Sequence, residues 1–510
     1  MLRQEIIKLI AKSIKELQKE KKFSKFDIGK IQVEHPENKV YGDYAANIAM
    51  AVAKIEKKNP MEVAEIISEK LKAKSEKLFE KIEVAKPGFI NFFISKKYLQ
   101  NQLGEILEQK ESFGSVRIGR GQKVNIEFIS ANPTGELHIG HGRGAFFGDC
   151  LANVLKKTGY KVVREYLVND AKNSAQIKEL GKTALGRGTT YFNNYLKGKI
   201  SELKSQISRL RPASAGAAAG KQGHSTLRVL GAMSFGGQAK PSEGEAGYLL
   251  AQEIQKDIKN FIDKKLKIKF NVWTSEENLY RQNKVDGVYH LLKNKKLIYE
   301  KEKAEWLKTS EFGDSKDWVI IRATGEPTYL LSDIAYHKDK FNRGFDKIIN
   351  IWGADHQGHV GKIEAVARIL DYKGNLDVLI SQVVRLKGGK ISKRKGEVVA
   401  LEWLLEEVGL DATRFFYLAK SLDTQMEFDV GLAKEKTAKS PVFYIQYAFV
   451  RASSIIQKYD TEKNGKKRKV SAVIQPSLYK FIIHQTELEL IKLLIRFPEI
   501  IEDTSKDYQV

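Results

Sequence analysis

The sequence is poor in cysteine. Cys150 is the only one among 510 residues, so the chain cannot form an internal disulfide. A single thiolate is also too few for a structural zinc site unless scattered histidines join it. We therefore expect neither a disulfide framework nor a structural metal.

Long apolar runs are absent as well. No apolar run reaches about 18 residues, the length that a membrane-crossing helix requires. Near the start, Leu2, Ile6 and Ile10 recur at helical spacing among lysines, which predicts an amphipathic helix and not the apolar segment of a secretory signal. These features predict a cytoplasmic protein without a membrane anchor.

Acidic residues are outnumbered by basic ones. The chain has 87 Lys and Arg against 63 Asp and Glu, which gives a formal net charge of +24. Such a surplus favours a polyanionic partner, because basic side chains neutralise phosphates and release counterions. A lysine-rich, solvated surface would produce the same count, so composition alone leaves both interpretations open.

Material for a hydrophobic core is plentiful. Apolar residues make up 42% of the chain, and its length predicts about three domains. Apolar strands are expected at 124–129, 161–167, 347–352 and 378–384, with helical segments between them. This alternation predicts an α/β fold with a doubly wound parallel sheet, whose ligands bind beyond the carboxyl ends of the strands.

Two short motifs fall at such strand ends. In the first, His138 and His141 stand on either side of Gly140. Two imidazoles at a helix N-terminus can donate hydrogen bonds to phosphate oxygens, and a glycine lets a flat base approach the backbone. In the second, Lys390 and Lys393 follow two glycines and offer mobile cations to the same phosphates. Together the motifs predict an ATP site.

The pair of motifs resembles the signatures of class I aminoacyl-tRNA synthetases, and the flanking runs 132–135 and 142–145 resemble the arginyl-tRNA synthetases in particular. The resemblance implies a Rossmann-like catalytic domain that ligates L-arginine to tRNA(Arg) through arginyl adenylate. It implies ATP and Mg²⁺ as cofactors, and we expect a monomer with no metal ligated by protein side chains alone. The implied catalytic residues are His138, His141, Lys390 and Lys393, and the implied ATP-binding residues are Gly140, Gly142 and Ser392.

A pocket for arginine must match a planar cation with five N–H donors, so it needs carboxylates. Tyr329 and Asp333 are four residues apart, which places both on one face of a helix. The resemblance implies that Asp333 and Glu276 contact the guanidinium, while Glu127 and Asn132 lie nearer the amino and carboxylate groups. The implied arginine-binding residues are Glu127, Asn132, Glu276, Tyr329, Asp333 and Asp355.

Further stretches outline the domains. The runs 41–50 and 86–92 resemble the α+β N-terminal domain of the family, which binds the elbow of tRNA. This implies RNA contacts by Phe89 and Asn91, although a core phenylalanine and a turn asparagine would fit the same pattern. The predicted domains are an N-terminal tRNA-binding domain at 1–105, a catalytic domain at 106–425 and an all-α anticodon-binding domain at 426–510.

Two regions depart from this plan. Residues from about 206 to 243 are rich in glycine, alanine and serine and lack apolar periodicity, which predicts a flexible surface insertion. Relatives usually continue beyond the position of 497–499, so we expect an incomplete anticodon-binding domain that reads the anticodon weakly. The apolar residues expected to lack their usual cover are Leu488, Ile491, Leu494 and Ile495.

Alternative functions remain open at this point. Another class I synthetase is disfavoured, because cysteine-specific relatives need a thiolate zinc site and an apolar substrate would not suit Glu276 and Asp333. A non-catalytic tRNA-binding paralogue would have no need for histidines that donate to ATP phosphates. His356 and His359 could indicate a metal, but no third ligand stands near them in the sequence.

Overall fold

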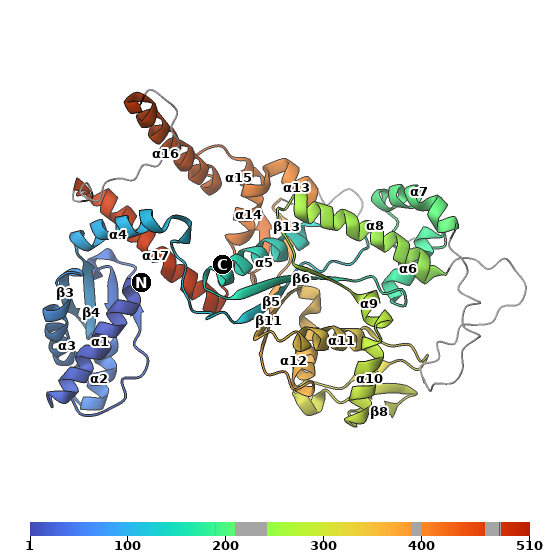
Figure 1. The fold of residues 1–510 in the computed structure, drawn as a ribbon, viewed down its shortest axis with the longest axis horizontal. Coiled ribbons are helices and arrows are strands. Elements are labelled where there is room, and N and C mark those ends of the chain that lie inside the picture. The colour runs from blue at the N-terminus through green and yellow to red at the C-terminus, as the bar shows by residue number, and fades with distance from the viewer. Residues whose placement is uncertain (189, 210–241, 389–398, 465–478, 480) are drawn as a thin grey trace, which may run out of the picture. The chain divides into compact units, whose positions relative to one another are not determined.

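The structure is a computed structural model that describes residues 1–188, 190–209, 242–388, 399–464, 479 and 481–510. Their contacts form two compact units (Figure 1), which are described separately. The first unit contains residues 1–116 and 456–507, and the second contains residues 117–455 and 508–510. None of the described helices is both long enough and apolar enough to cross a membrane.

A five-stranded sheet with the strand order β12-β11-β5-β6-β7 forms the centre of the second unit. All its strand pairs are parallel, which confirms the predicted doubly wound fold. The strands are β5 (Lys123–Glu127), β6 (Lys161–Val168), β7 (Val272–Ser275), β11 (Lys347–Gly353) and β12 (Asn375–Ser381). The chain proceeds outward from β5 to β7 and then returns to β11 on the other side of β5, so the strand order reverses between β5 and β11. Ligands of such sheets bind at this point.

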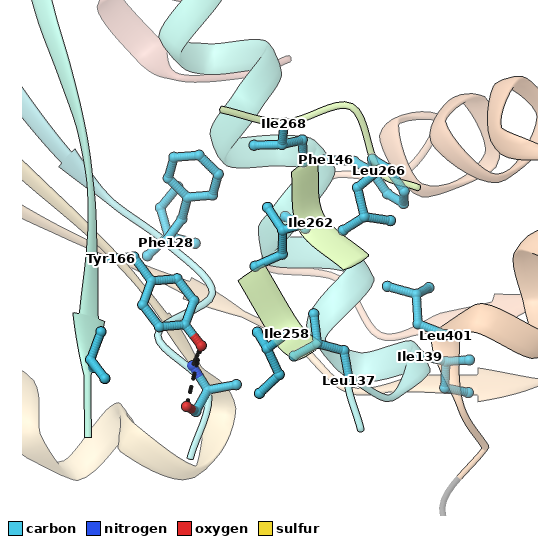
Figure 2. Close-up of a cluster of buried hydrophobic side chains, with 14 of the residues drawn as sticks. Phe128, Leu137, Ile139, Phe146, Tyr166, Ile258, Ile262, Leu266, Ile268 and Leu401 are labelled. Atoms are coloured by element: carbon cyan, nitrogen blue, oxygen red, sulfur yellow. Dashed lines mark hydrogen bonds between the residues drawn. The ribbon is translucent and has the colours of Figure 1, made fainter. Parts of the chain in front are cut away.

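Helices cover the sheet and contribute most of the core. The principal ones are α5 (Ile139–Lys157), α6 (Ala175–Ala184), α7 (Asn194–Ser208), α8 (Glu243–Lys264), α9 (Glu276–Arg281), α10 (Lys284–Asn294), α11 (Tyr329–Asn342) and α12 (Val360–Ile369). Figure 2 shows Ile258 and Ile262 of α8 near Phe128 and Tyr166 at the sheet. The Tyr166 hydroxyl accepts from the backbone N–H of Ala131 at 3.0 Å, so this buried ring is both packed and hydrogen-bonded.

Smaller elements complete the second unit. Antiparallel strands form a separate three-stranded sheet in the order β10-β9-β8, and β13 pairs with β14 in parallel. These strands are β8 (Ile298–Lys301), β9 (Ala304–Leu307), β10 (Trp318–Ile321), β13 (Val384–Leu386) and β14 (Met426–Phe428). The later helices are α13 (Leu401–Val408), α14 (Leu410–Leu418), α15 (Val430–Lys434) and α16 (Pro441–Asn464), the last of which continues into the range of the first unit.

The first unit is an α+β structure, as predicted. Its antiparallel sheet has the order β1-β2-β4-β3. The elements are α1 (Leu2–Lys19), β1 (Val33–Glu34), β2 (Tyr44–Ala46), α2 (Ile48–Glu56), α3 (Pro60–Ser75), β3 (Phe79–Ala85), β4 (Phe89–Ile94), α4 (Lys96–Gln109) and α17 (Gln485–Asp507). The apolar positions predicted for the first helix are buried, Ile6 and Ile10 completely.

The prediction for the last helix is wrong in one respect. Leu488, Ile491 and Ile495 are buried in the core of the first unit, while Leu494 remains 37% exposed. The reason is that the apolar face of α17 packs on the N-terminal elements. N-terminal residues, which are far away in the sequence, therefore cover three of the four apolar side chains.

The predicted insertion also begins later than expected. Gln206 and Ile207 belong to α7, and Ile207 is a core residue with 6% exposure. At the other edge, Ser242 caps α8 by accepting from the N–H of Glu245 at 3.2 Å. Residues 210–241 lie outside the described residues.

Helices α6 and α8 cross each other at very short distance. A Cβ atom at Gly181 would lie 1.7 Å from the carbonyl oxygen of Glu243, and one at Gly247 would lie 1.8 Å from that of Ile177. Both distances are far below van der Waals contact, so only glycine fits at these two positions while the helices remain this close.

We predict that Gly181→Ala lowers the free energy of unfolding by about 2–3 kcal/mol, because the added methyl group must push α6 and α8 apart. Chemical denaturation of the purified protein measures this effect. Gly198→Ala is the matched control, since a Cβ at Gly198 of α7 meets nothing within 4 Å. That change should be neutral or stabilising by up to about 1 kcal/mol through helix propensity. Equal losses in both variants would contradict the packing argument.

Candidate active site

The first signature motif caps helix α5 with two histidine rings. His138 is the N-cap residue in extended conformation, and its Nδ1 accepts from the N–H of Gly140 at 3.1 Å. The Nδ1 of His141 accepts from the N–H of His138 at 3.1 Å. A backbone N–H can only donate, so neither Nδ1 carries a proton and each neutral ring carries its proton on Nε2.

Burial keeps both rings neutral. It lowers the pKa of His141 to about 3 and also lowers the pKa of His138, which the charge of Asp355 partly offsets. The ring centroids are 3.7 Å apart, so a charge on one ring would oppose a charge on the other. The motif therefore holds two Nε2–H donors at a helix N-terminus, an arrangement suited to phosphate oxygens.

The two glycines of this motif differ in their surroundings. A Cβ at Gly140 would lie 2.8 Å from Cε1 of His138 and would displace that ring. A Cβ at Gly142 would lie 2.9 Å from Leu401 and 3.0 Å from Tyr417, so this glycine lets α5 pack against α13 and α14. Gly142 thus has a packing role, and contact with ATP by either glycine stays a prediction.

The second signature motif lies outside the described residues, and with it Lys390, Ser392 and Lys393. The segment that follows is described and is attached to the first motif. The N–H of Ile139 donates to the carbonyl of Val399 at 3.0 Å, and the N–H of Leu401 donates to that of Leu137 at 2.8 Å.

Two carboxylates of the predicted arginine pocket lie in buried surroundings. Glu276 begins α9 with 8% exposure, and Asp333 lies one turn into α11. Burial raises the pKa of Glu276 to about 7 and that of Asp333 to about 8, and the charge of Glu276 contributes to the shift of Asp333. Among the described residues neither carboxylate forms an ion pair, so the two negative charges destabilise each other.

A small cavity opens beside these residues. It has a volume of about 100 Å³ and is lined by Glu276, Tyr280 and Tyr329, among others. The hydroxyl of Tyr329 accepts from the N–H of Gln176 at 3.4 Å. The structure therefore brings Glu276 and Tyr329 to one cavity, with Asp333 four residues after Tyr329 on the same helix.

Glu127, which was also predicted to bind arginine, has partners inside the protein. Its Oε2 accepts from the ammonium of Lys340, and its Oε1 accepts from the hydroxyl of Ser130 at 2.9 Å. The exposed fractions are 3% for Glu127 and 0% for Lys340. The charge of Glu127 is therefore balanced inside the protein at the end of β5, and its predicted contact with arginine stays a prediction.

The remaining predicted residues of the pocket are more exposed. Asn132 is exposed in the turn after β5. The side chain of Asp355 is 80% exposed and lies 3.4 Å from Nε2 of His356. Its charge acts on His138, which places Asp355 near the first signature motif. No group of three His, Cys, Asp or Glu side chains with a metal-binding arrangement occurs in the part of the chain that the structure describes.

The predicted RNA-contact residues lie in β4 of the first unit. Phe89 is half-buried at the start of the strand, but Asn91 is only 4% exposed. Asn91 pairs in register with Ala45 of β2 and Glu83 of β3. The structure therefore places Asn91 inside the sheet and not on an RNA-accessible surface, which corrects its predicted role.

Two important residues were missed by the sequence interpretation. Lys340 is seven residues after Asp333 on the same buried helix face, and a lysine at an apolar position was the available signal. Asp170 accepts from Ser275 Oγ at 2.8 Å and from the N–H of Glu277 at 2.9 Å, which holds the helix start that carries Glu276. Its position at the end of β6 was the signal.

We predict that Glu276→Gln stabilises the protein without substrate by about 1–3 kcal/mol at pH 8. The folded-state pKa is raised to about 7 from 4.5, so the wild type loses stability as pH rises from 4.5 through 7. The advantage of the variant should therefore be absent at pH 4 and complete above pH 7. Denaturation curves across this range measure it, with exposed Glu300→Gln as a control without a pH-dependent difference.

Comparisons with known proteins cover almost the whole chain. Three domain families match: "Arginyl tRNA synthetase N terminal domain" at 4–94, "tRNA synthetases class I (R), catalytic domain" at 102–174 and 243–418, and "DALR anticodon binding domain" at 445–510. The catalytic match is interrupted at 175–242, which includes α6, α7 and the predicted insertion.

Curated relatives agree with these domains. An arginine–tRNA ligase of Bacillus pumilus is 39% identical over 493 residues, which cover 93% of this chain and 83% of the relative. The arginine–tRNA ligase of Bacillus subtilis is 38% identical over 496 residues, with 94% and 83% covered. Among solved structures, the arginyl-tRNA synthetase of Thermus thermophilus has a TM-score of 0.69 at 18% identity, covering 99% of this chain and 88% of that one. The last comparison supports the fold.

Proposed function

The chain belongs to the arginyl-tRNA synthetase family, and we propose that it ligates L-arginine to tRNA(Arg) in an ATP-dependent reaction with arginyl adenylate as the intermediate. The chain covers 83% of the length of these relatives. The observation that carries the substrate assignment is a pair of carboxylates, the buried Glu276 and the partly buried Asp333, neither of which forms an ion pair among the described residues. A guanidinium supplies the positive charge that both lack.

Arginine binding completes the electrostatics of the pocket. In the empty pocket, burial favours the protonated forms of Glu276 and Asp333 near neutral pH. A guanidinium stabilises the ionised forms, so protons leave the carboxylates when arginine binds. A substrate with an apolar side chain offers no such compensation, which is how the pocket selects arginine.

The first chemical step needs no nucleophile from the protein. The carboxylate of arginine attacks the α-phosphorus of ATP, a new P–O bond forms, and pyrophosphate leaves. His138 and His141 donate Nε2–H groups to the phosphates, while Lys390 and Lys393 follow the leaving pyrophosphate. Mg²⁺, when bound with ATP, neutralises part of the phosphate charge.

In the second step a ribose hydroxyl of the terminal adenosine attacks the carbonyl carbon of the adenylate. The ester bond to tRNA forms, and AMP leaves with the electron pair of the broken C–O bond. The basic surplus of the chain, +24 in formal charge, favours association with the RNA. We propose that the enzyme acts as a monomer in the cytoplasm.

The alternative of a non-catalytic tRNA-binding paralogue explains less. A binding module has no use for two neutral imidazole donors at a helix N-terminus, nor for unpaired carboxylates with raised pKa values. Arginine-dependent exchange of pyrophosphate into ATP, measured with and without tRNA, decides between the two. Exchange supports the synthetase, and its absence under both conditions would leave the paralogue.

We predict that Asp333→Asn raises the KM for arginine, because a buried guanidinium loses a charged partner. The cost should be about 2–4 kcal/mol, while the KM for ATP stays within about twofold. Pyrophosphate exchange at varied arginine measures the effect. Asp339→Asn is the control, since Asp339 lies on the same helix but pairs with Lys284 at 2.6 Å. An unchanged arginine KM in the Asp333 variant would remove it from the pocket.

The affinity for arginine should also rise with pH. Glu276 and Asp333 have pKa values of about 7 and about 8, and only their ionised forms attract a guanidinium. We therefore expect the dissociation constant of arginine, measured by calorimetry without ATP, to fall between pH 6 and pH 9. Proton release should accompany binding near pH 7. A dissociation constant that is independent of pH would contradict the assignment.

We predict that His141→Ala slows adenylate formation about 10²–10³-fold, the usual effect of removing one donor that acts on charge in a transition state. Affinity for tRNA should stay near that of the wild type, since His141 is placed at ATP. Single-turnover formation of arginyl adenylate and a filter-binding assay with tRNA separate the two effects. His290→Ala, an exposed histidine of α10, is the control.

A further inference from the structure

A buried chain of hydrogen bonds connects the sheet to the helix that carries Asp333. It starts at Glu127 of β5, whose carboxylate pairs with the ammonium of Lys340 on α11. Lys340 also donates to Oδ1 of Asn350 in β11 at 3.0 Å. The amide Nδ2 of Asn350 meets Nε2 of His337 at 2.9 Å, and Nδ1 of His337 meets the backbone carbonyl of Asp333 at 2.8 Å.

The donor and the acceptor of each hydrogen bond in this series can be assigned. An ammonium can only donate, so the Asn350 oxygen must face Lys340 and its NH₂ group must face His337. Nε2 of His337 therefore accepts, and its Nδ1–H donates to the carbonyl of Asp333. The three linking residues Lys340, Asn350 and His337 have exposed fractions of 0%, 0% and 2%, so water does not compete for these bonds.

Burial also keeps the linking histidine uncharged. It lowers the pKa of His337 to about 3, and the positive charge of Lys340 acts in the same direction. A neutral ring with one donor and one acceptor is the form that the two neighbours require. The ring thus fixes the turn of α11 that contains Asp333 relative to the end of β5 and the middle of β11.

We propose that Glu127, Lys340, Asn350 and His337 form a positioning network that sets the place of Asp333, so that Asn350 and His337 determine arginine affinity without touching the substrate. The inference rests on the proposed role of Asp333 in binding arginine. It explains why a lysine and a carboxylate are buried together on the helix that carries Asp333 and at the end of β5. Small displacements of a binding group are costly, because its hydrogen-bond geometry is lost.

Asn350→Asp is the sharpest test, because it keeps the shape of the side chain and replaces the NH₂ donor with a carboxylate oxygen, which also adds a negative charge beside Lys340. Lys340 still finds an acceptor, but two acceptors then face each other at His337. The ring must move or take up a second proton. We expect the arginine KM to rise about tenfold or more while the ATP KM changes by less than about twofold. His337→Leu should do the same, and His337→Gln, which keeps a donor and an acceptor, should be milder.

Asn125→Asp is the matched control. Asn125 is a fully buried asparagine of β5 whose Nδ2 donates to Glu165 at 2.5 Å, so the change removes a comparable bond outside the network. It should alter stability but not the arginine KM.

If Asn350→Asp and Asn125→Asp shift the arginine KM alike, the network is only structural and the inference fails. If Asp333→Asn raises the arginine KM and Asn350→Asp does not, the positioning network is contradicted but the proposed arginine pocket is supported. If Asp333→Asn has no effect on the arginine KM, the proposed pocket itself is contradicted.

A spectroscopic measurement works even if a variant does not fold. In the ¹⁵N-histidine spectrum of the wild-type protein, His337 should appear as the neutral Nδ1–H tautomer at pH 6, and its signals should shift when arginine is added. An Nε2–H tautomer, a charged ring at pH 6, or no response to arginine would each overturn the proposal.

Discussion

The buried ion pair of Glu127 and Lys340 links the central sheet of the second unit to the helix that carries Asp333. The two residues join the end of β5 to α11, and Asn350 adds β11. A buried pair of this kind contributes little net stability, because both ions lose their hydration. Its value lies in geometry, since any other arrangement would leave a charge buried without a partner. The pair and Asn350 thus fix the position of α11 relative to β5 and β11, the strands between which the strand order reverses.

The electrostatics of the site are divided between two environments. At the start of α5, burial keeps two histidines neutral and leaves them as donors. Near α9 and α11, two carboxylates form no ion pair among the described residues, and burial raises their pKa values. In the proposed function, the first environment donates hydrogen bonds to an anion, and the second supplies carboxyl groups that ionise when a cation binds. The unpaired carboxylates reduce stability in the empty protein, as is usual for groups that serve a ligand.

The sequence predicted the parallel sheet, the helix start at His138 and the placement of Tyr329 and Asp333 on one helix, because each depends on local spacing. It did not predict that Glu127 pairs with Lys340, 213 positions away, that Asn91 is buried, or that Leu488 packs on the N-terminal elements. Those facts depend on long-range contacts, which periodicity does not encode. The first edge of the insertion was also misplaced, because residues 206–208 continue α7 and Ile207 packs in the core.

The packing of α17 on the N-terminal elements has a consequence for the order in which the chain folds. Residues 1–116 leave the ribosome first, but Leu488, Ile491 and Ile495 belong to the same core. That core is complete only when α17 has been synthesised. Until then its apolar face is open to chaperones, and residues 117–455 of the second unit are made before the first unit can close.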